Sequence, residues 1–269
     1  FLEKEEALSR NRSVLETDSH IDQELWNKIV ALGWTGIRIP EEYGGLGLGH
    51  LELCVIAEEL GRYLAPVPFS SSVYLFTEAI INYANDEIKK DLLPKLVSGE
   101  VIGTLAVTEE LHAPSKGNIK VSVEKDILNG KKIAVPDAGI ATHSLVVSKS
   151  AKGISLQLVD LSSSGIKVQH QENIDESRGH FSLEFDSVKS QLIGDENSGW
   201  ELYESIINQA AVLFSYEQIG GSQAALDMAI NYAKERYAFG RPIGSYQAIK
   251  HKLADMYVAL TLAKSNCYY

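Results

Sequence analysis

The sequence predicts a mixed α+β protein with several domains, in the order helical, β, helical. Apolar residues recur with a helical period from about His20 to Gly99, and short alternating or β-branched runs then follow until about Ile193. The helical period returns at Ser198. The predicted domains are an all-α domain over residues 1–100, a small β-barrel or sandwich over 101–195, and a helical domain over 196–269 that is incomplete and holds only its first two helices.

The helical segments of the first domain carry their own signals. The apolar stripe of one helix includes Leu53, Cys54, Ile56, Ala57 and Leu60. Asp86 and Glu87 place acids in the first turn of a later helix, where they interact favourably with the helix dipole. Gly99 is a plausible stop for that helix. The glycine-rich residues 43–49 lack the strand before and the Gly-Lys-Ser/Thr ending of a phosphate loop, so we expect a shaped turn there.

The middle segment consists of short strands separated by turn residues. Asn129 and Gly130 lie between two apolar runs, and this dipeptide is a strong signal for a hairpin turn. Strands at this spacing predict a small barrel or a sandwich. The predicted strands cover residues 103–108, 120–123, 144–147, 155–159 and 181–185.

Two long helices are expected after the β-segment. The first runs from Ser198 to about Tyr237, and the second begins near Ser245 without a Gly or Pro to end it. We therefore expect the chain to stop inside a domain at Tyr269. The absence of Met at Phe1 leads us to expect further residues at the other end.

Composition limits the classes of function. Of the 269 residues, 45% are hydrophobic and 23% charged, and no apolar run approaches the roughly 20 residues that span a bilayer. We expect no integral membrane association and, without a signal-peptide pattern, a bacterial cytoplasmic or mitochondrial matrix protein. The net charge of −11 disfavours binding to the phosphates of nucleic acids.

Cysteine and histidine usage points away from disulfide frameworks and metals. The only cysteines are Cys54 and Cys267, which we interpret as buried free thiols in a reducing compartment. The seven histidines lack metal-ligand spacing, so no metal site is predicted.

One segment carries a specific pattern. Residues 232–256 contain Arg-x-x-Phe-Gly-x-Pro-Ile, then Tyr-Gln, then Leu-Ala-Asp-Met, and this order closely resembles the C-terminal signature of acyl-CoA dehydrogenases. Residues 33–49 resemble the N-terminal signature of that family, and residues 107–109, Val-Thr-Glu, resemble the start of its flavin-contact motif. The resemblance covers nearly the whole chain. It implies that the last domain is a four-helix bundle, about half of which lies beyond residue 269.

The resemblance implies an FAD-dependent dehydrogenation of an acyl-CoA thioester. In that reaction a carboxylate removes the α-proton while a hydride leaves the β-carbon for flavin N5. Such a base needs a raised pKa, and the enolate-like charge needs preorganised donors. The resemblance also implies an electron-transferring flavoprotein as electron acceptor and a homo- or heterotetramer.

Four residues match cofactor contacts of the family. Arg236 matches an arginine that reaches the FAD pyrophosphate of a neighbouring subunit, where a guanidinium suits phosphate oxygens. Phe239 and Gln247 match nearby FAD contacts, and Thr108 matches a position that faces the flavin.

The sequence leaves open which residue serves as the catalytic base. Most family members carry it on a later helix, beyond Tyr269, and the position that a minority use corresponds to Ala210. Glu217 lies seven residues on, along roughly the same helix face, and is the candidate within the chain; otherwise it is a structural residue or a subunit contact. The surrounding residues 215–222 resemble a divergent branch that acts on sterol side chains or other bulky acyl groups.

Departures from the family pattern keep alternatives open. Ala134 stands where a flavin-packing tryptophan is usual, and Pro136 replaces a residue with a hydroxyl and a backbone N–H. One alternative is therefore a non-catalytic or degenerate partner subunit of a heteromeric dehydrogenase, which lends Arg236 to a catalytic subunit. Another is an acyl-CoA-binding or oxygen-using relative with different chemistry.

Overall fold

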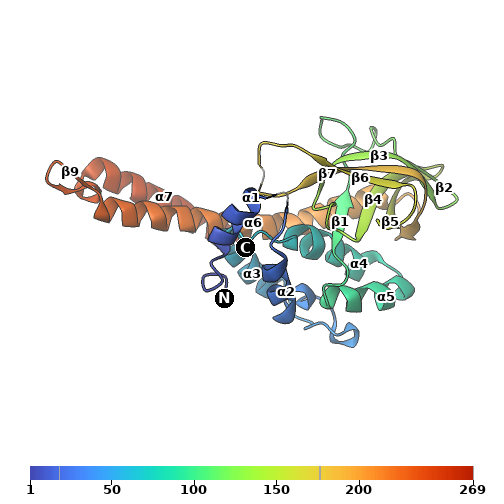
Figure 1. The fold of residues 1–269 in the computed structure, drawn as a ribbon, viewed down its shortest axis with the longest axis horizontal. Coiled ribbons are helices and arrows are strands. Elements are labelled where there is room, and N and C mark those ends of the chain that lie inside the picture. Colours follow the sequence, from blue (N-terminus) through green and yellow to red (C-terminus); the bar gives the residue numbers. More distant parts are fainter. Residues whose placement is uncertain (18, 176, 269) are drawn as a thin grey trace. The chain divides into compact units, whose positions relative to one another are not determined.

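A computed structural model describes residues 1–17, 19–175 and 177–268. Helices come first, a β-sheet follows, and two long helices end the described chain, so the predicted α+β class is confirmed (Figure 1). Two sets of residues form compact units, and the division into three domains stays a prediction. The first unit comprises Phe1–Ser9, Leu51–Ala65 and Ala211–Tyr269, and the second comprises Arg10–His50 and Pro66–Ala210.

Two of the N-terminal helices begin at side chains that satisfy free backbone N–H groups. The Asp22 carboxylate accepts from the Leu25 N–H at 2.9 Å, and the Asn85 carbonyl oxygen accepts from the Ile88 N–H at 2.9 Å. The predicted stop at Gly99 is confirmed, since its φ of 72° is left-handed. The helices are α1 Ala7–Leu15, α2 Gln23–Ala31, α3 His50–Tyr63, the π-helical segment η3 Ser70–Thr77, α4 Glu78–Tyr83 and α5 Asp86–Val97.

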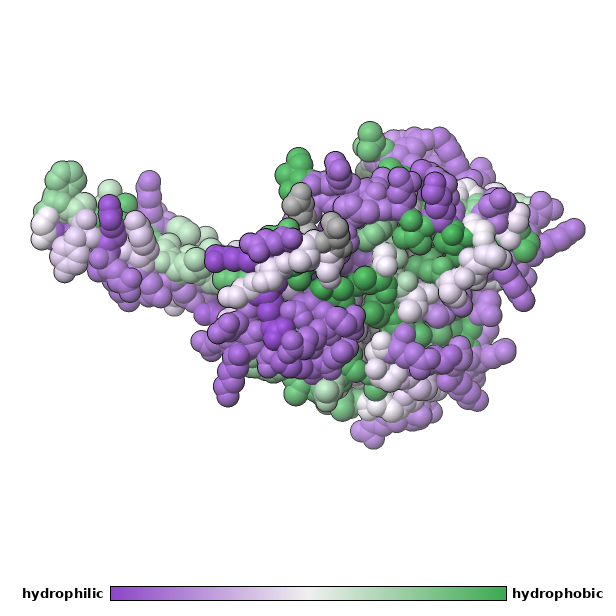
Figure 2. All heavy atoms as spheres, viewed as in Figure 1, coloured by the Kyte–Doolittle hydropathy of each residue, from purple (hydrophilic) through white to green (hydrophobic). Residues whose placement is uncertain are grey.

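The β-segment is one eight-stranded, sandwich-like sheet rather than a closed barrel. The strand order is β6-β7-β3-β2-β4-β5-β8, with β1 paired in parallel to β4. Its core consists of aliphatic and aromatic side chains, and hydrophobic side chains gather where α4 and α5 meet the sheet (Figure 2). The strands are β1 Gly103–Ala106, β2 Ser122–Glu124, β3 Ile127–Pro136, β4 His143–Ser150, β5 Gly153–Asp160, β6 Ile166–Gln171, β7 His180–Lys189 and β8 Gln191–Ile193.

The predicted hairpin turn at Asn129 and Gly130 is wrong. The turn between β2 and β3 is made by Lys125 and Asp126, which have φ values of 49° and 64°. Two successive left-handed residues give the turn that matches strand twist. Asn129 and Gly130 lie inside β3, where the register shifts after Leu128 and Gly130 has a φ of 131°. Leu128 and Gly130 are two residues apart in β3, whereas their partners Val188 and Phe185 are three apart in β7, so the extra residue of this β-bulge lies in β7 and Gly130 lies opposite it.

The two predicted long helices are present as α6 Gly199–Glu235 and α7 Gln247–Cys267. They are joined by the short strands β9 Tyr237–Ala238 and β10 Arg241–Pro242 and by the 3₁₀ turn η4 Ile243–Ser245. Among the described residues, no helix has the length and apolarity that a membrane span requires.

Within the first unit, α3 and α6 touch backbone to backbone at glycines. A Cβ atom on Gly61 would lie 2.0 Å from the Glu217 carbonyl oxygen, and one on Gly220 would lie 1.8 Å from the Glu58 carbonyl oxygen. Any larger residue would therefore force the two helices apart. The neighbouring Gly221 is different, since its nearest contact, the Gly61 carbonyl oxygen, lies at 3.4 Å.

Two adjacent glycine substitutions should separate packing from helix propensity. We expect Gly220→Ala to destabilise the protein by at least about 2 kcal/mol, because the added methyl overlaps the α3 backbone. Gly221→Ala has room, and we expect it to be neutral or stabilising by up to about 1 kcal/mol. Urea unfolding of both variants checks this, and equal effects would contradict the close contact of α3 and α6.

Candidate functional site

The segment that carries Thr108 is held by a fully buried lysine. Lys132, in β3, has no exposed side-chain surface, and its Nζ donates to the Val107 carbonyl oxygen at 2.8 Å and to Glu109 Oε1 at 2.7 Å. The residue after Lys132 adds a third hydrogen bond from β3 to this segment, because the Ile133 N–H donates to the Thr108 carbonyl oxygen at 2.8 Å. Thr108 is therefore fixed on both sides by its neighbours' bonds to β3.

Glu109 also connects this segment to the residues just before β2. Its carboxylate also accepts the Lys120 N–H at 2.7 Å and the Val121 N–H at 3.1 Å. Desolvation lowers the pKa of Lys132 to about 8, although the pairing with Glu109 opposes that shift. A buried pair of this kind holds its place only when further hydrogen bonds satisfy both partners, as they do here.

The sequence analysis did not single out Lys132, although a signal was available. Strand alternation places every second side chain on one face, and Lys132 lies an even number of residues from the buried Leu128. A lysine at a core position needs a buried partner.

Residues 134–137, where the family's tryptophan pattern is absent, have an unusual backbone. Ala134 and Asp137 have φ values of 51° and 55°, a conformation that is costly for residues with a Cβ. The Ala134 N–H donates to Gln171 Oε1 at 2.7 Å, and the Asp137 N–H donates to the Gly179 carbonyl oxygen at 2.9 Å. With Pro136 lacking an N–H, three of the four residues offer no backbone donor to a ligand.

Asp137 itself is a buried acid that the sequence analysis missed. Its side chain accepts a hydrogen bond from the Ser71 hydroxyl in η3, and the residue is 2% exposed. Burial raises the pKa of the Asp137 carboxyl, while the nearby Arg178 guanidinium opposes the rise. Because the carboxyl joins β3 to η3, it ties the strained segment to the helical layer.

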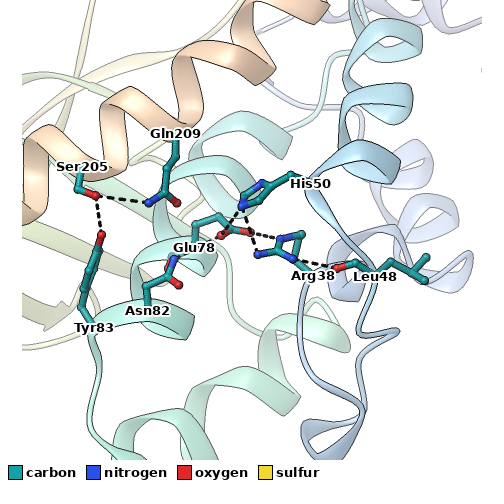
Figure 3. A network of polar contacts seen from close by, with 8 residues as sticks. All are labelled: Arg38, Leu48, His50, Glu78, Asn82, Tyr83, Ser205 and Gln209. Carbon is teal, nitrogen blue, oxygen red and sulfur yellow. Dashed lines mark hydrogen bonds and ion pairs between the residues drawn. The ribbon is translucent and has the colours of Figure 1, made fainter. Parts of the chain in front are cut away.

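A second network fixes the glycine-rich turn. The fully buried Glu78 carboxylate accepts from Arg38 Nε at 2.9 Å, and His50 Nε2 lies 3.7 Å from its other oxygen (Figure 3). Arg38 also donates to the Leu48 carbonyl oxygen at 2.9 Å, at the end of the turn. The prediction of a shaped turn rather than a phosphate loop agrees with this arrangement, because Gly45 has no space for a Cβ beside the Ile39 backbone.

The connection between α6 and α7 brings three predicted cofactor residues together. Arg236 follows α6 directly, Phe239 is 97% exposed at the hairpin turn, and Gln247 begins α7. The Ile243 N–H donates to the Arg236 carbonyl oxygen at 2.8 Å, which closes the connection. The neighbouring Arg241 is engaged differently, since its guanidinium lies 4.1 Å from the centre of the Tyr246 ring.

The candidate base is placed within the first unit. Glu217 is half-buried on α6 where that helix meets α3, and its Oε1 atom is buried. Ala210, the alternative position, is fully buried and has no titratable group. The roles of Glu217, Thr108, Arg236, Phe239 and Gln247 stay predictions.

A cavity of about 720 Å³ in the second unit is separate from these residues. It lies beside α5 and is lined by acids, by His143 and by apolar side chains such as Leu92 and Leu158. Burial lowers the pKa of His143. No residue predicted for the site lines this cavity in the described chain.

Comparisons with known proteins decide the family. The sequence pattern of the acyl-CoA dehydrogenase N-terminal domain matches residues 1–100, and that of the acyl-CoA dehydrogenase C-terminal domain matches residues 197–269. An acyl-CoA dehydrogenase from Bacillus subtilis is 30% identical over 95% of this chain and 72% of its own length. This chain belongs to the acyl-CoA dehydrogenase family. The resemblance predicted from the signature residues is thereby confirmed.

Two further relatives have names that include an acyl or steroid group. The mitochondrial isovaleryl-CoA dehydrogenase of Pongo abelii is 31% identical over 91% of this chain, which spans 62% of that protein's length. A solved variant of the Tcur3481-Tcur3483 steroid ACAD is 30% identical, with a TM-score of 0.87, over 99% of this chain and 73% of the solved one.

Family membership indicates an FAD-dependent oxidoreductase, as the sequence predicted. The α6–α7 connection fits such a cofactor, because it presents an exposed guanidinium, an exposed aromatic ring and a carboxamide on one hairpin. The Thr108 segment is rigid, as a cofactor contact requires, but residues 134–137 offer few donors. The fit is therefore better at the connection than at the end of β3.

Substitution of two adjacent lysines should test how much the buried Lys132–Glu109 ion pair stabilises the protein. We expect Lys132→Met to destabilise the protein by about 3–5 kcal/mol, because it leaves the Glu109 carboxylate buried without its cation. Lys131→Met is the matched control, since Lys131 and its partner Glu184 are both exposed, and we expect a change within about 0.5 kcal/mol. Chemical denaturation at neutral pH measures both, and a mild effect of Lys132→Met would overturn the assigned role of the pair.

Proposed function

We propose that this chain is part of an FAD-dependent acyl-CoA dehydrogenase that introduces an α,β double bond into an acyl-CoA thioester. The observation that supports this most strongly is the exposed group of Arg236, Phe239 and Gln247 on the α6–α7 connection. When bound, FAD would accept the hydride from the substrate β-carbon. The Arg236 guanidinium would pair with the pyrophosphate of a neighbouring subunit's cofactor, and the Phe239 ring would cover its apolar surface.

Thr108 would contact the flavin from a backbone that is already held in place. Its carbonyl is bonded to β3, and the residues on either side of it are bonded to Lys132, so the Thr108 side chain is presented without loss of backbone freedom on binding. This rigidity matters because a misplaced contact near the reacting carbon costs rate.

Glu217 is our candidate for the carboxylate that removes the α-proton. Its partial burial on α6 suits a base that acts away from bulk water. The alternative is a base beyond residue 269, with Glu217 holding α3 against α6.

The substrate we propose is a branched or bulky acyl-CoA. Two relatives of about 30% identity are named for isovaleryl-CoA and for steroid substrates, and both groups are bulkier than a straight short chain. Electrons would pass to an electron-transferring flavoprotein, and a homo- or heterotetramer would bring Arg236 to a neighbour's cofactor. Either a bacterial cytoplasm or a mitochondrial matrix would suit such a protein.

One specific observation supports the second candidate function, that of a non-catalytic partner subunit. Ala134, Pro136 and Asp137 leave no backbone N–H for a flavin, and Ala134 offers no ring to pack on it. In this alternative the chain donates Arg236 to the FAD of a catalytic partner. The name of the steroid relative, which joins Tcur3481 and Tcur3483, is in keeping with a heteromeric assembly.

A visible spectrum of the full-length protein separates these two functions. For the catalytic function we expect flavin absorption that bleaches anaerobically with isovaleryl-CoA or with a sterol side-chain CoA thioester. A colourless protein that stays colourless with added FAD would refute it for this subunit alone. In that case flavin and activity should appear only after mixing with the partner subunit.

The role of Arg236 is tested by a matched pair of arginines. We expect Arg236→Gln to weaken FAD binding by roughly 10-fold to 100-fold, since a phosphate contact with a charged donor is lost. Arg241→Gln is the control, because that guanidinium is held over the Tyr246 ring, and we expect less than about threefold. FAD titration of the assembled protein by fluorescence measures both, and equal effects would reject the assignment.

The candidate base is tested by Glu217→Gln in an anaerobic stopped-flow experiment. If Glu217 removes the α-proton, flavin reduction by acyl-CoA should slow by at least about 100-fold while the flavin spectrum and protein stability are kept. Glu58→Gln is the control on α3, because Glu58 pairs with Lys264. A rate like that of the unmodified protein would place the base elsewhere.

A further inference from the structure

The first unit places α3 beside both α6 and α7. Gly220 on α6 meets the Glu58 backbone, and the Glu58 carboxylate accepts from Lys264 Nζ on α7 at 2.6 Å. Arg62, one turn along α3, pairs with Asp227 on α6 at 2.7 Å. Position 58 of α3 is therefore level with position 264 of α7, and α3 runs in the same direction as α6.

This register brings the chain's only two cysteines to the same level. Since α6 and α7 form a hairpin, α7 runs against α3, so a step back along α3 corresponds to a step forward along α7. Cys54 lies one turn before Glu58, and Cys267 lies almost one turn after Lys264. Far apart in sequence, the two thiols should therefore face each other across the α3–α7 contact.

A contact between two tyrosines independently indicates that the end of α7 lies beside this part of the first unit. The Tyr216 ring on α6 packs edge-on against the ring of Tyr268, the residue after Cys267, with 5.3 Å between ring centres. Tyr216 is fully buried, and both thiols lie close enough to its phenol to interact with it electrostatically. Both cysteines are free thiols in the structure.

The two thiols differ in access. Cys54 is 6% exposed, and burial raises the pKa of its thiol, whereas Cys267 is half-buried. Reaction with a small oxidant needs a thiolate that the oxidant can reach, so Cys267 is the thiol that reacts first.

We propose that Cys54 and Cys267 form a reversible disulfide within one chain when the protein meets hydrogen peroxide, joining α3 to α7. The Cys267 thiolate attacks one peroxide oxygen, the O–O bond breaks, and hydroxide takes up a proton and leaves as water. The resulting sulfenic acid is attacked by the Cys54 sulfur, which loses its proton as the S–S bond forms. The S–O bond breaks, and a second water leaves.

The packing geometry allows this bond. Facing residues on helices packed at about 8–10 Å have Cα atoms within roughly 4–7 Å, which is the range that a disulfide needs. The glycines at 61 and 220 bring α3 close to α6, and the Glu58–Lys264 pair joins α3 to α7. Two thiols held in this way have a high effective concentration toward each other, so the second step is fast compared with further oxidation of Cys267.

The experiment treats the full-length protein with hydrogen peroxide, removes the peroxide with catalase, and alkylates the remaining thiols under denaturing conditions. We expect both thiols to resist alkylation, a mass loss of about 2 Da in the intact chain, and a peptide that links residue 54 to residue 267. Dithiothreitol should restore both thiols. The test needs neither flavin nor acyl-CoA, so its outcome is independent of the proposed dehydrogenase function.

Single-cysteine variants provide the controls. In Cys54→Ala, Cys267 has no partner, and we expect it to gain oxygen atoms instead. In Cys267→Ser, we expect Cys54 to remain a free thiol because it is buried. Oxygen addition to Cys267 in the unmodified protein, a link between two chains, or two thiols that stay reactive would each overturn the proposal, provided that circular dichroism shows the protein folded.

Discussion

The buried ion pair between Lys132 and Glu109 determines the position of everything around Thr108. Its charges are removed from water, which is costly, and two backbone N–H groups and one carbonyl offset that cost by completing the hydrogen bonds of both partners. Because those backbone groups lie just after β1 and just before β2, and Lys132 itself belongs to β3, a single pair fixes three segments. The predicted flavin contact thus depends on a lysine that touches no ligand.

The hydrogen bonds that hold the end of β3 also explain why it has so few backbone donors left for a ligand. Ala134 and Asp137 keep a left-handed backbone only because surrounding groups hold them there: Gln171 bonds the first, and Gly179 and Ser71 bond the second. Two of these bonds use up the backbone N–H groups of Ala134 and Asp137, which a ligand could otherwise accept from. This is why the proposed cofactor contacts of this chain rest chiefly on the α6–α7 connection.

Sequence reasoning succeeded where signals are local and failed where a partner is distant. The ends of α5 and the extent of α6 follow from caps, periodicity and propensity, which neighbouring residues set. The turn was misplaced because Asn129 and Gly130 suit a turn, whereas the actual turn uses Lys125 and Asp126 and Gly130 lies opposite a β-bulge of β7. The burial of Lys132 depends on Glu109, which only folding brings close.

The packing of α3 shows how one local requirement can create a second function. Gly61 and Gly220 are needed because the backbones of α3 and α6 touch, and that contact also fixes the level at which α3 meets α7. Once the level is fixed, the positions of Cys54 and Cys267 are no longer independent, since each lies about one turn from the Glu58–Lys264 pair. The proposed disulfide therefore depends on helix packing rather than on a local turn, and its reversibility depends on access of a reductant to the bond.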